Sequence, residues 1–201
     1  LTPAEAARLY TAFLRDALRL YAQLEADVRL YLAPPLPEEK LEGVPAGVTV
    51  HEQEGASLGE RMQEAFRDTF DAGYERASII GTDHPTLPLA FVRQSFSALE
   101  TPRAICIGPS EDGGFYLLGM NAYYPQLFKG MTYSHERVFA ATLARIGSTD
   151  ARVTVLPRWY DVDTPGMLER LVEDLESEEI DAPHTRQMIE QLELHGLAKT
   201  S

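Results

Sequence analysis

Residues 77–108 read ASIIGTDHPTLPLAFVRQSFSALETPRAICIG, an order of apolar run, polar turn, amphipathic segment and second apolar run. The pattern predicts a strand at 77–81, a helix at 89–99 and a second strand at 103–108. Strands that alternate with helices of this length are typical of a mostly parallel sheet with helices on both faces. The sequence therefore predicts an α/β protein.

The same alternation extends to both sides of this unit. Towards the amino end, Thr2 and Glu5 form the pattern of a capping box in front of a helical stripe. No internal repeat or low-complexity segment interrupts the pattern, so a single domain, 1–201, is expected. The further expected helices are 2–24, 58–72, 136–146 and 165–175, and the further expected strands are 28–32, 48–50, 115–119 and 153–156.

The composition is acidic. The 201 residues include 18 Lys or Arg and 31 Asp or Glu, which gives a net charge of −13, and 44% of the residues are hydrophobic. Broad binding to nucleic acid is not expected, because it requires clustered Lys and Arg. No apolar run reaches the ~20 residues of a membrane-spanning helix, and no leader sequence opens the chain. A cytoplasmic protein without a membrane span is the expectation.

Cys106 is the only cysteine, which excludes an intrachain disulfide and a cysteine-based zinc site. Its neighbours Ala104, Ile105 and Ile107 are apolar, so we expect a buried core residue rather than a nucleophile. The sequence contains no Gly-x-Ser-x-Gly elbow and no Gly-x-x-x-x-Gly-Lys loop. Serine hydrolases and P-loop ATPases are therefore disfavoured.

Open α/β sheets bind ligands beyond the carboxyl ends of their strands, so polar residues at those ends are the first candidates. Asp83 follows the strand 77–81, and Gly81 permits close approach of another group. The alternative interpretation is that Asp83 caps the next turn, or the helix that begins near Pro88. His84 is of interest only as the neighbour of this aspartate.

Asp161 and Asp163 stand at the equivalent place after the strand 153–156. Alternation along an extended backbone puts both side chains on one side. Asp163 could instead be the N-cap of the helix at Pro165, with Thr164 as the competing cap. Carboxylates that converge from different strand ends repel one another, and a divalent cation held by oxygen ligands is the usual reason for such an arrangement. The sequence therefore predicts a metal site.

Two glycine-containing turns are further candidates. The turn at 54–62 joins a strand to a helix, and its backbone N–H groups could point at a base or a phosphate, with Arg61 either a ligand or a solvated helix residue. The segment 109–116 carries Glu111 and Asp112 in front of two glycines. It is either a tight hairpin turn or a functional loop.

Four blocks in this order resemble a bacterial family of small proteins known as a domain of unknown function and often labelled glycosyltransferase-like. The blocks are GASLGERM (55–62), IGTDHP (80–85), GPSEDGGFYLLG (108–119) and DVDTP (161–165). The resemblance implies the nucleotide-diphospho-sugar transferase (GT-A) fold, a three-layer α/β/α sandwich with a mostly parallel mixed sheet. Members of this fold group transfer either sugars or nucleotides, so the fold does not choose the reaction.

The resemblance also implies roles for individual residues. Asp83 stands where the metal-binding aspartate of the fold lies, and Asp163 resembles the second acidic ligand, with Asp161 as its neighbour; Mg²⁺ or Mn²⁺ is the implied ion. Asp112 or Glu111 is the candidate general base. The implied nucleotide-binding residues are Gly55, Ser57, Leu58, Gly59, Arg61, Gly81 and Thr82, and the implied acceptor-binding residues are Gly113, Gly114 and Ser134. In the family a threonine usually follows the serine at the position of Ser134, and here His135 stands in its place.

Family members begin with a strand and a basic glycine-containing loop ahead of the helix that starts here at Thr2. The sequence that starts at Leu1 contains neither, so we expect that it omits an amino-terminal stretch of the natural protein. The alternative is that one central strand is missing and the phosphate site is half built. Residues 177–201 are expected to form an acidic carboxyl-terminal extension.

Three functions follow from the resemblance. The first is a metal-dependent transferase with a nucleoside-diphosphate sugar donor and a small-molecule acceptor. The second is a nucleotidyltransferase that uses a nucleoside triphosphate and a phosphorylated small molecule, and the third is a non-catalytic sugar-nucleotide-binding protein. The sequence leaves open whether the protein forms a homodimer.

Overall fold

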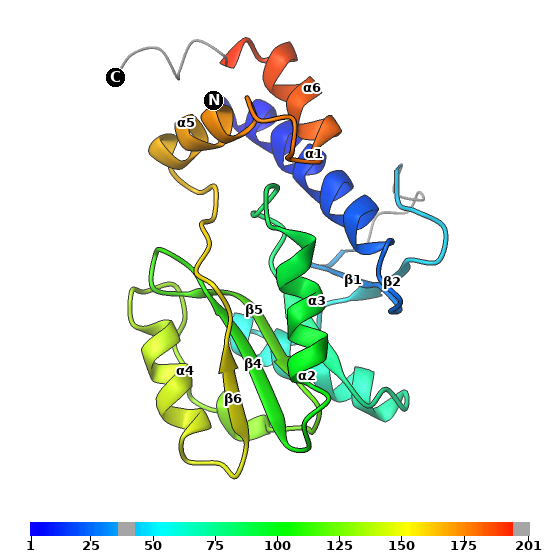
Figure 1. Cartoon of the computed structure of the whole chain (residues 1–201), viewed down its shortest axis with the longest axis vertical. Helices are drawn as coiled ribbons and strands as arrows, with labels where there is room; N and C mark the ends of the chain where they lie inside the picture. Colours follow the sequence, from blue (N-terminus) through cyan, green and yellow to red (C-terminus); the bar gives the residue numbers. More distant parts are fainter. Residues whose placement is uncertain (36–42, 195–201) are drawn as a thin grey trace.

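The computed structural model describes residues 1–35 and 43–194. Its helices and strands alternate along most of the chain, as the sequence predicts (Figure 1). The helices are α1 (Pro3–Tyr21), α2 (Leu58–Asp71), α3 (Leu89–Ala98), α4 (Val138–Ile146), α5 (Pro165–Asp174) and α6 (Pro183–Gln191), with a 3₁₀ turn at Pro125–Leu127. The strands are β1 (Arg29–Leu32), β2 (Thr49–Glu52), β3 (Ala77–Ile80), β4 (Ala104–Pro109), β5 (Phe115–Met120) and β6 (Arg152–Val155).

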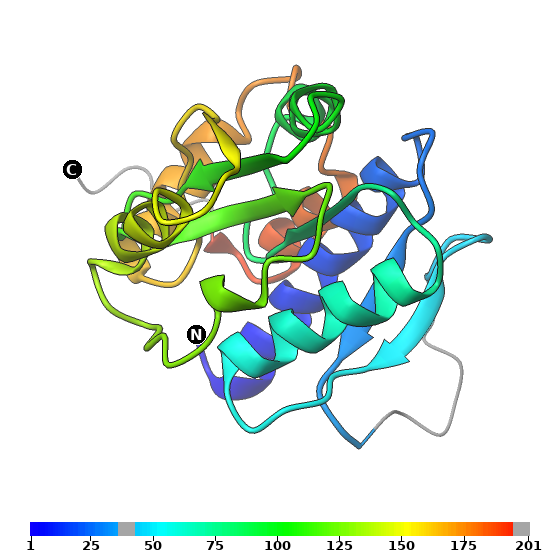
Figure 2. The same cartoon turned by 90° about the horizontal axis from the view of Figure 1, so that it is seen from below.

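The strands form two sheets rather than the single sheet that was expected. The larger sheet has the order β3-β5-β4-β6, in which β5 is antiparallel to both neighbours and β4 is parallel to β6. In the smaller sheet β1 and β2 pair in parallel, with Leu30 opposite Val50. Figure 2 shows this pair beside α2, apart from the green and yellow strands of the larger sheet. Within the described parts of the chain no strand joins β1 to β3, which is the physical reason for the division.

Helices pack against both faces of the larger sheet, which is mixed rather than mostly parallel because β5 runs antiparallel to both of its neighbours. Side chains that alternate along β4 point to opposite faces. Ile105 and Ile107 pack in a cluster with Phe66 of α2 and Ile146 of α4. Ala104 and Cys106 pack in a second cluster with residues of α1 and α3. The expected core position of Cys106 is confirmed, because it is fully buried.

A third core cluster joins α1, α5 and α6 at one end of the molecule (Figure 1). Residues 183–191, expected to belong to an acidic extension, instead form α6. The carboxylate of Asp16 in α1 accepts the amides of His184 at 3.1 Å and Thr185 at 2.7 Å, and Ile189 is buried. Because its amino end is capped from α1, this segment belongs to the domain. Residues 195–201 of the expected extension lie outside the described residues.

Two helix starts are built by local capping, and the sequence predicts the one at α1. Thr2 and Glu5 form a capping box at α1, and Ser57 and Glu60 form another at α2. None of the helices that the structure describes is long and apolar enough to cross a membrane.

Candidate functional site

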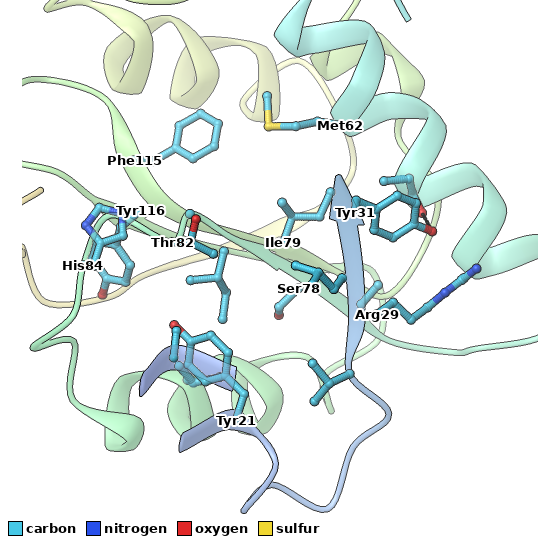
Figure 3. A pocket seen from close by; sticks show the side chains of 18 of the residues that line it. Tyr21, Arg29, Tyr31, Met62, Ser78, Ile79, Thr82, His84, Phe115 and Tyr116 are labelled. Atoms are coloured by element: carbon cyan, nitrogen blue, oxygen red, sulfur yellow. Dashed lines mark hydrogen bonds between the residues drawn. The ribbon is translucent and has the colours of Figure 1, made fainter. Parts of the chain in front are cut away.

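A cleft of about 1640 Å³ lies between the two sheets. Its walls come from α1, β1, α2, β3, the turn between β4 and β5, and the segments at 133–138 and Asp161. In Figure 3, Tyr21 of α1 and Met62 of α2 lie on opposite sides of Ile79 of β3. Nine predicted site residues line the cleft: Leu58, Arg61, Gly81, Thr82, Asp83, Asp112, Gly114, Ser134 and Asp161. Six do not line it: Gly55, Ser57, Gly59, Glu111, Gly113 and Asp163.

Asp83 lies just beyond the carboxyl end of β3, beside His84. The Nε2 atom of His84 is 3.0 Å from Oδ1 of Asp83, and its Nδ1 atom is 3.0 Å from the carbonyl oxygen of Tyr160. Burial alone would lower the pKa of His84, but the hydrogen bond and charge of Asp83 outweigh it and raise this pKa. Burial would raise the pKa of Asp83, and its pairing with His84 brings it below its usual value. The aspartate is held ionised beside a ring that favours the imidazolium.

The alternative role of Asp83 as a helix cap is not what the structure shows. Helix α3 has Pro88 as its N-cap and no side-chain capping hydrogen bond. The Asp83 side chain therefore remains directed to the cleft that it lines.

Asp161 reaches the same cleft from the segment that follows β6. The Ser110 hydroxyl donates a hydrogen bond to Oδ1 of Asp161, and the amide of Val162 donates to the carbonyl oxygen of Asp83 at 3.0 Å. Burial raises the pKa of Asp161, and the negative charges of Asp112 and Asp163 raise it further against the effect of the Ser110 hydrogen bond. Acidic groups thus accumulate around Asp161, with His84 as a neighbouring group of positive charge.

Asp163 lies two residues further on and is exposed. Helix α5 is capped by Thr164, whose side chain accepts the amide of Met167 at 3.3 Å. The N-cap role that we considered for Asp163 is therefore taken by the competing Thr164.

Asp83 and Asp161 are the cleft residues, among those predicted as metal ligands, that could contribute carboxylates to a hard divalent cation. Among the described residues no group of three or more His, Cys, Asp or Glu converges as a complete metal site. Mg²⁺ is commonly held by one or two carboxylates together with substrate phosphates. The carboxylates of Asp83 and Asp161 are ligands of this kind, and the negative charges of Asp112 and Asp163 act on Asp161 in the same region.

Two backbone amides of the turn before α2 are already bonded within the cap of this helix. The Glu60 carboxylate accepts the amides of Ala56 at 2.7 Å and Ser57 at 3.3 Å. Gly55 has a φ of +122°, and a Cβ there would lie 2.7 Å from the Cβ of Glu60, so the turn requires glycine. Arg61 donates to the Gly55 carbonyl and to Gln53 and lines the cleft. Arg61, rather than the amides of Ala56 and Ser57, presents polar groups to the cleft from this segment.

The segment 109–116 is the turn of a hairpin between β4 and β5, one of its two expected interpretations. The amide of Ser110 donates to the Gly114 carbonyl at 3.0 Å, and the amide of Gly114 donates to Asp112 Oδ1 at 2.7 Å. Glu111 instead forms an ion pair of 2.8 Å with Arg170 of α5. The two acids of the turn therefore face different surroundings, and Asp112 is the one that lines the cleft.

The segment at 133–135 closes the cleft near α2. A Cβ at Gly59 would lie 2.6 Å from the ring of Tyr133, which shows how closely this ring covers the start of α2. Ser134 has a φ of +64° and lines the cleft together with His135. Gly59 thus acts by making room for Tyr133.

Several residues around the site could not be assigned from the sequence. Tyr160 is buried; its hydroxyl donates to Asp174 at 2.6 Å and accepts from Thr86 at 3.0 Å. The guanidinium of Arg170 lies 4.0 Å from the centre of its ring. The only signal for this network is the position of Tyr160 directly before Asp161, because the partners come from elements far apart in the chain.

An α/β domain with an acidic cleft at the carboxyl end of β3 is the class that the fold and the site define. Residues 17–135 match the model of the family described as uncharacterized proteins conserved in bacteria, DUF2064. The chain belongs to this family, and the resemblance noted from its four sequence blocks is confirmed. No curated protein matches the chain.

A solved structure supports the same relationship. The chain is 30% identical to a provisionally named nucleotide-diphospho-sugar transferase of Desulfovibrio desulfuricans G20. The two structures superpose with a TM-score of 0.86 over 96% of this chain and 86% of that chain. The α/β fold class is therefore shared with this protein.

Proposed function

We propose that the protein is a metal-dependent transferase with a nucleoside-diphosphate sugar as donor. One observation carries the proposal: Asp83, at the end of β3, and Asp161, after β6, line the same cleft. Parallel α/β sheets place their ligands beyond the carboxyl ends of the strands. The similarity to the protein from Desulfovibrio desulfuricans G20 supports the donor class.

Asp83 and Asp161 are the residues that would hold Mg²⁺ or Mn²⁺, with the donor diphosphate completing the coordination. The ion would supply Lewis-acid stabilisation of the charge that develops on the leaving diphosphate. Asp163 follows two residues after Asp161 and is exposed, so we rank it below Asp83 and Asp161 as a metal ligand. Arg61 supplies positive charge to the cleft wall for the donor.

Asp112 is the candidate general base for an acceptor hydroxyl. Its Oδ1 atom accepts the amide of Gly114, which fixes the carboxylate at the mouth of the hairpin turn. Glu111, the other candidate, is paired with Arg170 at 2.8 Å, an arrangement that disfavours proton abstraction. Gly114 and Ser134 line the cleft close to Asp112 in the fold and form the proposed acceptor side.

The test is a thermal-shift titration with UDP and GDP, with and without Mg²⁺ or Mn²⁺. A ligand that binds only the native state raises the melting temperature with its concentration. We expect a nucleotide-dependent rise that requires the metal and that is lost in Asp83→Asn, while Asp150→Asn, on a surface ion pair with Arg103, keeps it. A rise that does not depend on the metal would contradict the proposal.

The reaction is then assigned by product analysis. Release of a nucleoside diphosphate from a sugar nucleotide supports sugar transfer. Release of pyrophosphate from a nucleoside triphosphate would instead assign nucleotidyl transfer, and binding without turnover across both panels would assign a sugar-nucleotide-binding protein.

A further inference from the structure

His84 joins the two chain segments that carry the cleft carboxylates. Its Nε2 atom is 3.0 Å from Oδ1 of Asp83, which follows β3. Its Nδ1 atom is 3.0 Å from the carbonyl oxygen of Tyr160, the residue directly before Asp161. One side chain therefore contacts both halves of the site.

Both contacts require the ring to donate. A backbone carbonyl oxygen and an ionised carboxylate only accept hydrogen bonds, so each ring nitrogen must present its N–H group. The side chain is 4% exposed, and its ring meets that of Tyr116 edge-on at 5.8 Å between centroids. Water has little access to the carbonyl oxygen of buried Tyr160, so a residue that cannot donate would leave this acceptor poorly satisfied. The Asp83 carboxylate is 45% exposed and can be hydrated, so what it loses with the His84 donor is its fixed orientation.

The backbone before the pair is shaped to fit it. A Cβ at Gly81 would lie 2.8 Å from Oδ1 of Asp83 and 3.0 Å from Nε2 of His84. Only glycine leaves the space into which this pair folds back against the end of β3. The expected contribution of Gly81 to the site is thus the room it gives to the Asp83–His84 contact.

The geometry points to His84 as the positioning residue of the cleft. Its Nε2–H orients the Asp83 carboxylate, and its Nδ1–H fixes the segment that presents Asp161, so that this one ring sets how the two carboxylates face each other. Both nitrogens are occupied by protein acceptors, which leaves His84 no role in contact with the reacting atoms. The inference rests on the proposed function, because carboxylate placement matters there for holding a cation.

Two near-isosteric variants separate the two contacts. The amide nitrogen of Gln in His84→Gln comes near the place of Nε2, and that of Asn in His84→Asn comes near the place of Nδ1. Trp159, the only tryptophan of the chain, precedes Tyr160 and reports on this segment by acrylamide quenching of its fluorescence. Exchange of the Val162 amide, which donates to the Asp83 carbonyl, reports on the junction.

We expect His84→Asn to keep the Trp159 quenching of the wild type and His84→Gln to increase it. His84→Leu, which loses both donors, is expected to speed exchange of the Val162 amide by about tenfold or more while the amides of β4 and β5 keep their rates. Should His84→Leu fail to fold, the Asn and Gln variants carry the same comparison. Wild-type quenching in His84→Gln and unchanged Val162 exchange in His84→Leu would overturn the inference.

Mn²⁺ binding, followed by electron paramagnetic resonance in the presence of UDP, distinguishes positioning from simple stabilisation. Loss of a residue that orients a metal ligand typically lowers metal affinity about 10- to 100-fold, and we expect this for His84→Leu and His84→Asn, with a smaller loss for His84→Gln. Faster Val162 exchange with unchanged Mn²⁺ affinity would overturn the positioning role. Absence of Mn²⁺ binding in the wild type would instead refute the proposed function, while the exchange and quenching results still decide the two hydrogen bonds of His84.

Discussion

The amide of Val162 donates to the carbonyl oxygen of Asp83 at 3.0 Å, which ties together two acidic segments far apart in the chain. The contact places the segment after β6 directly beside the end of β3. The aspartates on either side of Val162 do not share one environment, however. Asp161 lines the cleft and accepts the Ser110 hydroxyl, whereas Asp163 is exposed.

Asp161→Asn and Asp163→Asn should therefore differ in nucleotide binding. Removing the charge of a cleft carboxylate is expected to lower Mg²⁺-dependent UDP or GDP affinity by about tenfold or more. Asp163→Asn serves as the matched control and should change the affinity much less. Isothermal titration calorimetry of both variants checks the difference, and a larger loss in Asp163→Asn would restore that residue as the second ligand.

The order of helices and strands was predictable because the local spacing of apolar residues differs between helices and strands. The segments expected at 58–72, 77–81 and 103–108 appear as α2, β3 and β4 with ends shifted by a residue or so. Helix α6 was not predicted, because Met188 and Ile189 are its only large apolar residues and its amino end is capped by Asp16 from α1 rather than by a neighbour in sequence. The division of the sheet depends on which strand edges pair, which local spacing does not encode.

Part of the site was predictable for the same reason. Acidic residues just past apolar strands mark the ligand edge of an α/β sheet, and Asp83 and Asp161, which were singled out for this reason, both line the cleft. Strand alternation could not separate Asp161 from Asp163, because the difference arises where the chain turns into α5 with Thr164 as its cap. The hydrogen bond between His84 and the Tyr160 carbonyl could not be predicted from the sequence, because it depends on the folded positions of two distant segments.

The hairpin turn at the cleft should be intolerant of a side chain at Gly113. Gly113 and Gly73 have nearly the same φ, +92° and +91°, but a Cβ at Gly113 would lie 2.0 Å from the Glu136 carbonyl oxygen, whereas one at Gly73 meets nothing within 4 Å. Gly73→Ala should cost about 1–2 kcal/mol from the left-handed backbone alone, and Gly113→Ala about 1–3 kcal/mol more from the clash. Urea unfolding of both variants measures the difference, and equal losses would show that the turn at Gly113 relaxes freely.

The Tyr160 hydroxyl should contribute to stability through its buried bond to Asp174. Its distance to the carboxylate is 2.6 Å, and Tyr160 is 1% exposed. Tyr160→Phe keeps the ring under Arg170 and should lower the free energy of unfolding by about 1.5–3 kcal/mol, the range for a hydrogen bond to a charged group. Tyr74→Phe removes a similar bond of 2.7 Å to Asp27 at an exposed site and should cost less. Chemical denaturation of both variants tests this. An equal loss of the free energy of unfolding would show that burial does not strengthen the hydrogen bond of Tyr160.

Cys106 should make the protein less stable in alkaline solution. Burial raises the pKa of its thiol from 9.0 to about 12, because the thiolate would be poorly solvated in the core between β4 and helices α1 and α3. Between these two values the unfolded chain releases the thiol proton and the folded chain keeps it, so the contribution to stability is complete below pH 9.0 and is lost as the pH rises towards 12. Tyr116, the neighbouring titratable group, is retained in Cys106→Ala; burial is the larger cause of its raised pKa and the Cys106 charge the smaller, so most of its background slope remains.

The free energy of unfolding of the wild type should therefore fall more steeply between pH 9 and 11 than that of Cys106→Ala. In the native protein at pH 8, Ellman's reagent should react with Cys106 only slowly, and addition of urea should release a full equivalent of thiol, because the side chain is 0% exposed. Parallel stability curves for the two proteins, or rapid labelling without denaturant, would show that the thiol reaches solvent in the folded state.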